Sequence, residues 1–303
     1  MLARYLPAAL TGAPPLAKAM GMMLASSLSF ICMHALVAQV SQDLPAFEVA
    51  FFRNLFGLAW LTPALVRSRF APLRTTKLHL HALRGLTNSI SMLMFFTALA
   101  FTPLAQATAL AYTSPLFVTM AAALVLGEAL RIRRITALVF GFVGMLIVLR
   151  PGLIAIDTGP LLVIGSAILW AMAMLTIKVL SRTDSSLTIA AYMVVFLTPV
   201  TFIAALFVWQ WPTMAQLGWL VLIAAFGTTG HLLFNEAFRH ADATALMPLD
   251  FTKLIWASLI GFFAFGQIPD LWTWIGGAII FTSATYISYR EHQLARRARR
   301  TAG

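Results

Sequence analysis

The sequence predicts an all-α integral membrane protein of ten transmembrane helices, arranged as two inverted five-helix repeats with both termini in the cytoplasm. Three observations predict this fold class: the apolar composition, two short motifs that are repeated within the chain, and the distribution of basic residues. Of the 303 residues, 60% are hydrophobic and only 10% are charged, which is far from the composition of soluble domains.

Apolar runs of about 20 residues are long enough to cross a hydrocarbon core of roughly 30 Å as helices. Ten such runs follow one another along the chain: 18–40, 46–66, 79–101, 104–126, 132–150, 159–180, 187–208, 215–238, 243–265 and 271–289. Strands of an outer-membrane barrel would alternate in polarity, whereas GFVGMLIVL at 141–149 is apolar throughout. The expected organisation is a cytoplasmic segment at 1–17, a first repeat at 18–150, a second repeat at 159–289 and a basic cytoplasmic tail at 290–303.

Two short sequence motifs occur twice in the chain, once in each half. AQATAL at 105–110 returns as ADATAL at 241–246, and LTP at 61–63 returns at 197–199. Both pairs have the same offset, as an internal duplication requires. Because five helices are an odd number, the second copy would enter the membrane from the opposite face. In secondary transporters, inverted repeats of this kind open a central site alternately to the two sides.

The net charge of +11 comes from basic residues that gather on one face of the predicted topology. Most of the 21 Lys and Arg residues fall in the termini and in connections of that face, which is therefore expected to be cytoplasmic, whereas Arg150 lies at the other face. The tail RRARR at 296–300 is interpreted as an orientation and lipid anchor rather than as a nucleic-acid site. His79 and His81 are interpreted as solvated residues of a basic loop.

Four prolines interrupt the predicted helices. Pro63 and Pro199 occupy matching positions in helices two and seven. Pro115 and Pro248 lie in the corresponding helices four and nine, at positions that differ by one helical turn after the offset of the repeat is applied. Kinks at related positions of both halves indicate a site near the midplane, although membrane helices also tolerate proline without such a role.

Ionisable residues at membrane depth are costly, so each needs a partner or a use. Asp250 and Lys253 lie three residues apart on one helix face, where they can pair with each other or contact a substrate or a coupling proton. His231 and His34 can shuttle protons, or can donate to backbone carbonyls as neutral rings.

The remaining candidate site residues are one cation and two aromatic rings. Arg53 attracts an anionic group at the outer mouth, or it holds Glu48 or a helix end. Trp256 lies one turn beyond Lys253 on the same helix face, and Trp170 lies too deep for the interfacial belt. Either ring can stack on a ligand, hold a cation over its face, or pack against other helices. Arg84 is expected to be a structural residue that faces cytoplasmic headgroups or basic loop neighbours.

Several motifs of the first half, taken together, resemble the drug/metabolite transporter superfamily in its ten-helix, EamA-type branch. They are FEVAFFR at 47–53, LRG at 83–85, SPLFV at 114–118, LGE at 126–128 and GFVGMLIVLRPG at 141–152. The resemblance covers residues 18–289. It implies transport of a small metabolite across the bacterial inner membrane, through a central cavity lined mainly by helices other than the fifth and the tenth.

The opening FEVAFFR at 47–53 also looks like bacterial members that take up S-adenosylmethionine, and similar proteins carry riboflavin or export amino acids. Uptake of S-adenosylmethionine is therefore the expected function, with riboflavin uptake or amino-acid export as the alternative. The second half departs from the pattern at PLDFTKL (248–254) and GQIPD (266–270), which leaves the substrate open.

An intramembrane enzyme would need a nucleophile with its base, or metal ligands at workable spacing, and the sequence offers neither motif. Hence no enzymatic activity, cofactor or metal is expected. The expected partners are a small-molecule substrate, the lipid bilayer and a coupling proton, with no nucleic acid. The small-residue face of Ala137, Gly141 and Gly144 fits either the partner of a homodimer or packing within one chain.

Overall fold

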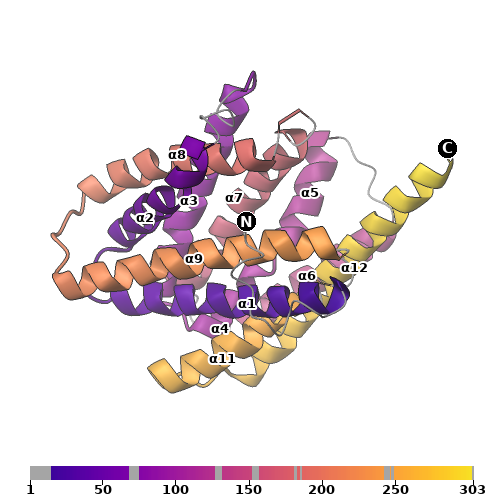
Figure 1. Cartoon of the computed structure of the whole chain (residues 1–303). Coiled ribbons are helices and arrows are strands. Elements are labelled where there is room, and N and C mark those ends of the chain that lie inside the picture. Colours follow the sequence, from indigo (N-terminus) through magenta and orange to yellow (C-terminus); the bar gives the residue numbers. More distant parts are fainter. Residues whose placement is uncertain are drawn as a thin grey trace.

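The computed structural model describes residues 15–67, 75–126, 132–151, 157–180, 183–184, 186–241, 246 and 249–301. Every regular element within these ranges is an α-helix, so the all-α prediction is confirmed. The helices, drawn in Figure 1, are α1 (Pro15–Val40), α2 (Ala46–Arg67), α3 (Leu78–Leu99), α4 (Leu104–Ala111), α5 (Ser114–Leu126), α6 (Ile132–Leu149), α7 (Thr158–Leu180), α8 (Ser186–Leu206), α9 (Met214–His240), α11 (Thr252–Phe265) and α12 (Leu271–Thr301).

Helices of the first half pack mainly against helices of the second half. Helix α1 lies along α9, α2 contacts α8 and α9, α3 contacts α7 and α8, and α6 contacts α12. Figure 1 shows α1 and α9 side by side over most of their length. The main hydrophobic core follows these contacts, because it includes Ile31 of α1, Leu110 of α4, Ile223 of α9 and Leu254 of α11. The interior is thus built at the junction between the two halves.

Many large apolar side chains face outward. Leu124 and Phe263 are each 80% exposed, and Phe140 and Trp211 are also exposed. Four segments are long and apolar enough to cross a membrane: Leu16–Val40, Leu104–Leu124, Thr158–Ile177 and Met214–Phe238. An apolar exterior on helices of this length suits a bilayer as solvent. The full count of ten spans stays a prediction.

The predicted helix at 104–126 is interrupted. Helix α4 ends at Ala111, Tyr112 and Thr113 form a turn, and α5 begins at Ser114. In the other half, residues 249 and 250 are helical, and Phe251 forms a turn before α11 begins at Thr252. In each half a short turn therefore interrupts the helical run shortly after the repeated motif, and Pro115 follows the first of these turns. Pro248 itself lies outside the described residues.

Helices α6 and α12 of the same chain pack closely at two glycines, Gly144 and Gly276. A Cβ atom placed on Gly276 would lie 2.6 Å from the carbonyl oxygen of Gly144, and one on Gly141 would lie 2.4 Å from the side chain of Leu116. Ala137 is buried as well. Of the two alternatives for this small-residue face, packing within one chain is the one present. Helix α12 continues through Thr301, beyond the end expected at residue 289.

Candidate functional site

An ion pair lies at the start of α11, at the junction of the two halves. The Nζ atom of Lys253 is 2.5 Å from Oδ1 of Asp250, the pairing that their three-residue spacing allows. Both side chains are largely buried, with exposed fractions of 19% and 16%. The same ammonium group lies 5.2 Å from the ring centroid of Phe30 and 5.8 Å from that of Phe234. Lys253 is therefore held by one carboxylate and two aromatic rings.

Phe30 of α1 also contacts the first of the two candidate histidines. Its ring centroid is 4.9 Å from that of His231 on α9, in an edge-to-face arrangement. Gly230 permits this approach, since a Cβ atom there would lie only 3.2 Å from the Phe30 ring. The hydroxyl of Ser26 donates to the carbonyl of Gly230 at 2.8 Å and fixes α1 on α9 beside this contact.

His34 lies two turns along α1 from Ser26, against another helix of the first half. Its ring centroid is 5.0 Å from that of Phe95 on α3. The Nδ1 atom of His34 and the Nε1 atom of Trp256 are buried and have no hydrogen-bond partner among the described residues. Trp256 follows Lys253 by one turn on α11, which packs against α1. Two polar atoms are thus left available for a ligand near the ion pair.

Arg53 of α2 is buried, with an exposed fraction of 9%. Its Nη1 atom donates to Oδ1 of Asn54 at 2.9 Å, and the Nδ2 atom of Asn54 donates to the hydroxyl of Thr201 on α8 at 3.3 Å. Glu48, the partner considered from the sequence, instead accepts a hydrogen bond from the backbone N–H of Gln210. The sequence-based alternative in which Arg53 holds Glu48 is therefore wrong.

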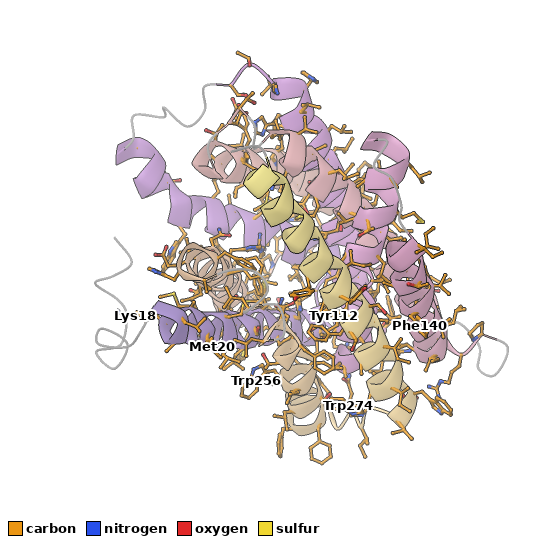
Figure 2. The ribbon with its side chains drawn as sticks, turned by 90° about the vertical axis from the view of Figure 1, so that its right-hand side faces the viewer. Lys18, Met20, Tyr112, Phe140, Trp256 and Trp274 are labelled. Carbon is orange, nitrogen blue, oxygen red and sulfur yellow. The ribbon has the colours of Figure 1, made fainter. Side chains whose placement is uncertain are left out.

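One hydrogen bond connects the interrupted helix of the first half to that of the second half. The hydroxyl of Tyr112 donates to the backbone carbonyl of Asp250 at 2.7 Å. Tyr112, Phe251 and Phe281 form a ring cluster with centroid distances between 4.5 and 6.1 Å. In Figure 2, Tyr112 lies toward the middle of the molecule, whereas Phe140 of α6 lies at its edge. Short turns that interrupt helices of both halves thus lie beside the ion pair.

The structure brings together most of the predicted site residues. Arg53 and Lys253 both lie close enough to His34 and His231 to interact with them electrostatically. Trp170 is separate, because it lies on α7, whose main packing partners are α3 and α5.

Sequence reasoning missed four further residues of the site: Phe30, Phe234, Asn54 and Tyr112. Phenylalanine is too common in membrane helices to stand out. The polar tip of Tyr112 in the middle of an apolar run was the one usable signal.

A cavity of about 220 Å³ opens where α4 begins and α6 and α11 end. Its walls include Gln106, Arg150 and Asp270, and its base includes Ala257 and Gly261. None of the predicted site residues lines it. Ala257 and Gly261 nevertheless follow Lys253 at intervals of four residues, so the cavity and the ion pair lie along the same face of α11.

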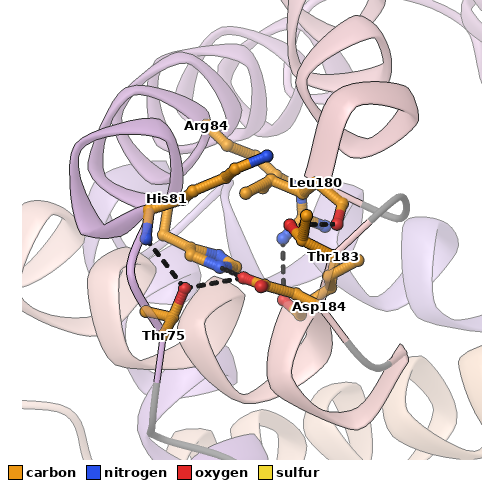
Figure 3. Close-up of polar contacts among 8 residues, drawn as sticks. Thr75, His81, Arg84, Leu180, Thr183 and Asp184 are labelled. Atoms are coloured by element: carbon orange, nitrogen blue, oxygen red, sulfur yellow. Dashed lines mark hydrogen bonds and ion pairs between the residues drawn. The ribbon is translucent and has the colours of Figure 1, made fainter.

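A second polar cluster corrects two expectations about the predicted cytoplasmic loops. His81 is not a solvated loop residue, because it is buried in α3, where its Nε2 atom lies 2.7 Å from Oδ2 of Asp184 (Figure 3). Thr75 donates to the same oxygen at 2.7 Å, and the ring of Tyr192 stacks on His81. The hydrogen bond with His81, followed by that from Thr75, holds the pKa of Asp184 below its ordinary value.

Arg84 lies beside this cluster and is also buried rather than exposed to headgroups. Its Nη1 atom donates to the carbonyl of Ile189 on α8 at 2.8 Å. The misinterpretation of His81 and Arg84 has one cause: α3 begins at Leu78 and packs against α7 and α8 from its first turns, so these side chains point into the helix bundle.

Comparison with known proteins finds relatives over nearly the whole chain. A riboflavin transporter of Vibrio cholerae is 33% identical over 286 residues, which cover 92% of this chain and 96% of that protein. An S-adenosylmethionine uptake transporter of Rickettsia bellii is 30% identical and covers 82% of this chain and 85% of its own. A pseudopaline exporter of Pseudomonas aeruginosa is 29% identical, with coverages of 88% and 95%.

One solved crystal structure superimposes with a TM-score of 0.56 at 18% identity, covering 86% of this chain and 95% of the other, and this likeness concerns the fold alone. The model of the EamA-like transporter family matches the chain twice, at residues 16–150 and 157–289. Together with the relatives, this double match shows that the chain belongs to the EamA-like transporter family, within the drug/metabolite transporter superfamily.

Proposed function

We propose that the protein is a secondary transporter that moves a small metabolite across the bacterial inner membrane by alternating access. In this proposal ten helices span the bilayer as two inverted five-helix repeats at 18–150 and 159–289, and both termini are cytoplasmic. Membership of a transporter family and the exposed apolar helices support the proposal.

The observation that carries the proposal is the position of the Lys253–Asp250 pair. It lies beside a helix break, contacts Phe30 of the other half, and is joined through the Asp250 carbonyl to Tyr112 at the second break. A charge pair at membrane depth on interrupted helices suits a site that a substrate or a proton can enter. The central site therefore comprises Asp250, Lys253, His231, His34, Arg53 and Trp256, with Trp170 a more distant member.

We take S-adenosylmethionine as the first substrate to test, because the helix-two motif resembles its transporters and the Rickettsia relative carries that name. Riboflavin is the second candidate, favoured by the 33% identity to the Vibrio transporter over 92% of the chain. Direction remains part of the test, since one relative is named as an exporter.

The decisive experiment is uptake of labelled S-adenosylmethionine, riboflavin and amino acids into proteoliposomes, with and without a proton gradient. Parent protein should show saturable uptake of one compound, and Asp250→Asn should lose most of it, because Lys253 would keep its charge without its carboxylate. Asp43→Asn, which changes an exposed carboxylate in the turn after α1, is the matched control and should transport normally. Equal uptake by parent and Asp250→Asn would remove Asp250 from the site.

A further inference from the structure

We propose that Arg53 binds an anionic group of the transported molecule, a carboxylate or a phosphate, and thereby selects metabolites that carry this group over analogues that lack it. The inference deepens the proposed function, because it assigns a chemical class of substrate to the same central site.

The first argument is charge. Arg53 is buried, and no carboxylate of the described residues lies within ion-pair distance of its guanidinium. Asp250 is already paired with Lys253. Arg84, a second buried guanidinium, interacts electrostatically with His231 and is likewise without a carboxylate in the described part of the chain. Burial of a cation without a counter-ion is costly, so the site as folded favours the entry of an anion.

The second argument is the hydrogen bonding of the guanidinium. Nη1 is occupied by Oδ1 of Asn54, whereas Nε and Nη2 make no hydrogen bond among the described residues. Nε and Nη2 form one edge of the planar group, and this edge matches the two oxygens of a carboxylate or phosphate. Asn54 is itself held by Thr201, so the free edge of Arg53 has a fixed direction.

The third argument is the space beside that edge. Gly227 of α9 faces Arg53, and a Cβ atom at Gly227 would lie 3.2 Å from both Nε and Nη2. Any side chain at this position would therefore press against both nitrogens of the free edge. The nearest other atom to the same point is the sulfur of Met33, at 2.7 Å, on a flexible thioether that can move away. Glycine at this position therefore keeps an α9 side chain off the free edge, and the Met33 thioether is the group that an entering anion would displace.

The chain of contacts connects this edge to the rest of the central site. Gly227 precedes His231 by one helical turn, and His231 contacts Phe30, over which Lys253 lies. An anionic group at Arg53 would thus place the remainder of the molecule against the rings of His231 and Phe30, near the unpaired Nδ1 of His34. Lys253, the second cation of the site, interacts electrostatically with the same two histidines as Arg53.

The test uses two matched pairs of compounds and measures binding to the purified full-length protein in detergent by isothermal titration. S-adenosylmethionine is compared with its decarboxylated analogue, and flavin mononucleotide is compared with riboflavin. In at least one pair the member that bears the carboxylate or phosphate, called here the anionic member, should bind about 10- to 100-fold more tightly, the range expected for a charge-assisted contact. The first pair reports a carboxylate and the second a phosphate.

Arg53→Gln should abolish this preference by weakening the anionic member alone, and Arg53→Lys should retain most of it. The proposal is overturned if parent protein binds both members of each pair equally, if neither anionic compound binds, or if Arg53→Gln weakens both members of a pair alike. The parent comparison needs no variant, so a folding defect in Arg53→Gln cannot mask the result.

The outcomes also separate this inference from the proposed function. Saturable uptake of one compound, with no preference for the anionic member of either pair, would support transport and overturn the role of Arg53. Binding of an anionic compound that depends on Arg53, without uptake of any compound in proteoliposomes, would support the role of Arg53 and overturn transport.

Discussion

The hydroxyl of Tyr112 donates a hydrogen bond to the backbone carbonyl of Asp250 at 2.7 Å and thereby ties together the two interrupted helices of the protein. Tyr112 lies in the turn between α4 and α5, and Asp250 directly precedes the turn at Phe251. Because the side chain of Asp250 pairs with Lys253, the Tyr112 bond also fixes the backbone from which the ion pair extends. This hydrogen bond therefore links the turn of the first half to the backbone of the charged centre in the second half.

Tyr112→Phe should uncouple the two breaks without opening a cavity. The variant keeps the ring contacts with Phe251 and Phe281 and removes one hydrogen bond, so the free energy of unfolding should fall by about 1 kcal/mol. The initial rate of substrate uptake in proteoliposomes should fall several-fold. Tyr286→Phe, at an exposed position of α12, is the matched control. An unchanged uptake rate in Tyr112→Phe would show that the bond plays no part in transport.

The Asp250–Lys253 pair should behave as one unit in a double-mutant cycle. Asp250→Asn and Lys253→Gln each leave a largely buried charge unpaired, whereas the double variant removes both charges. The double variant should therefore be more stable than the sum of the single effects predicts, with a coupling of about 1–3 kcal/mol. Chemical unfolding of the four proteins in detergent measures this term. Strictly additive effects would mean that the two side chains do not support each other.

Sequence periodicity and composition were sufficient for the helical class and for the pairing of Asp250 with Lys253, because three-residue spacing in a helix puts both side chains on one face. The prediction that His81 is a solvated loop residue was wrong, because two histidines among basic residues carry no information about the packing of α8 over the start of α3. The break at Tyr112 was also missed as such. The run at 104–126 stays apolar through the turn, and only Pro115 indicated an irregularity.

Ionised Asp184 should stabilise the folded protein, and this contribution to stability should disappear in acid. The hydrogen bonds with His81 and Thr75 hold the pKa of Asp184 below 3.8, its ordinary value. A carboxyl with a depressed pKa stabilises the fold fully above its unfolded-state pKa, and this stabilisation is lost as the pH falls through the lower folded-state pKa. The difference in melting temperature between parent and Asp184→Asn should be steady from pH 5 to about pH 4 and should shrink below it. A difference that grows on acidification would contradict this assignment.

The contact between α6 and α12 should tolerate no side chain at Gly276. A Cβ atom there would lie 2.5 Å from Val148 and 2.6 Å from the backbone oxygen of Gly144, and the backbone cannot move away cheaply. Gly276→Ala should lower the free energy of unfolding by roughly 1–3 kcal/mol, as overpacking does. Gly218→Ala on α9 is the control, because it has no atom within 4 Å and should stabilise the helix by about 0.5–1 kcal/mol. Thermal unfolding of both variants measures the contrast, and equal melting temperatures would contradict it.

Gly227→Ala should test the space beside Arg53 without altering any charge. The added methyl group would stand 3.2 Å from Nε and Nη2 of Arg53 and would crowd the edge at which the anionic group of the substrate is proposed to bind. The preference for the anionic member of a compound pair should therefore fall at least about tenfold, while Arg53 remains charged. Gly57→Ala lies at the same α2–α9 interface, but its Cβ atom would meet the hydroxyl of Thr228 at an ordinary 3.7 Å, so its preference should equal that of parent protein. If Gly227→Ala kept the full preference, the anion would have to approach Arg53 from another side, because both nitrogens of the free edge would be blocked.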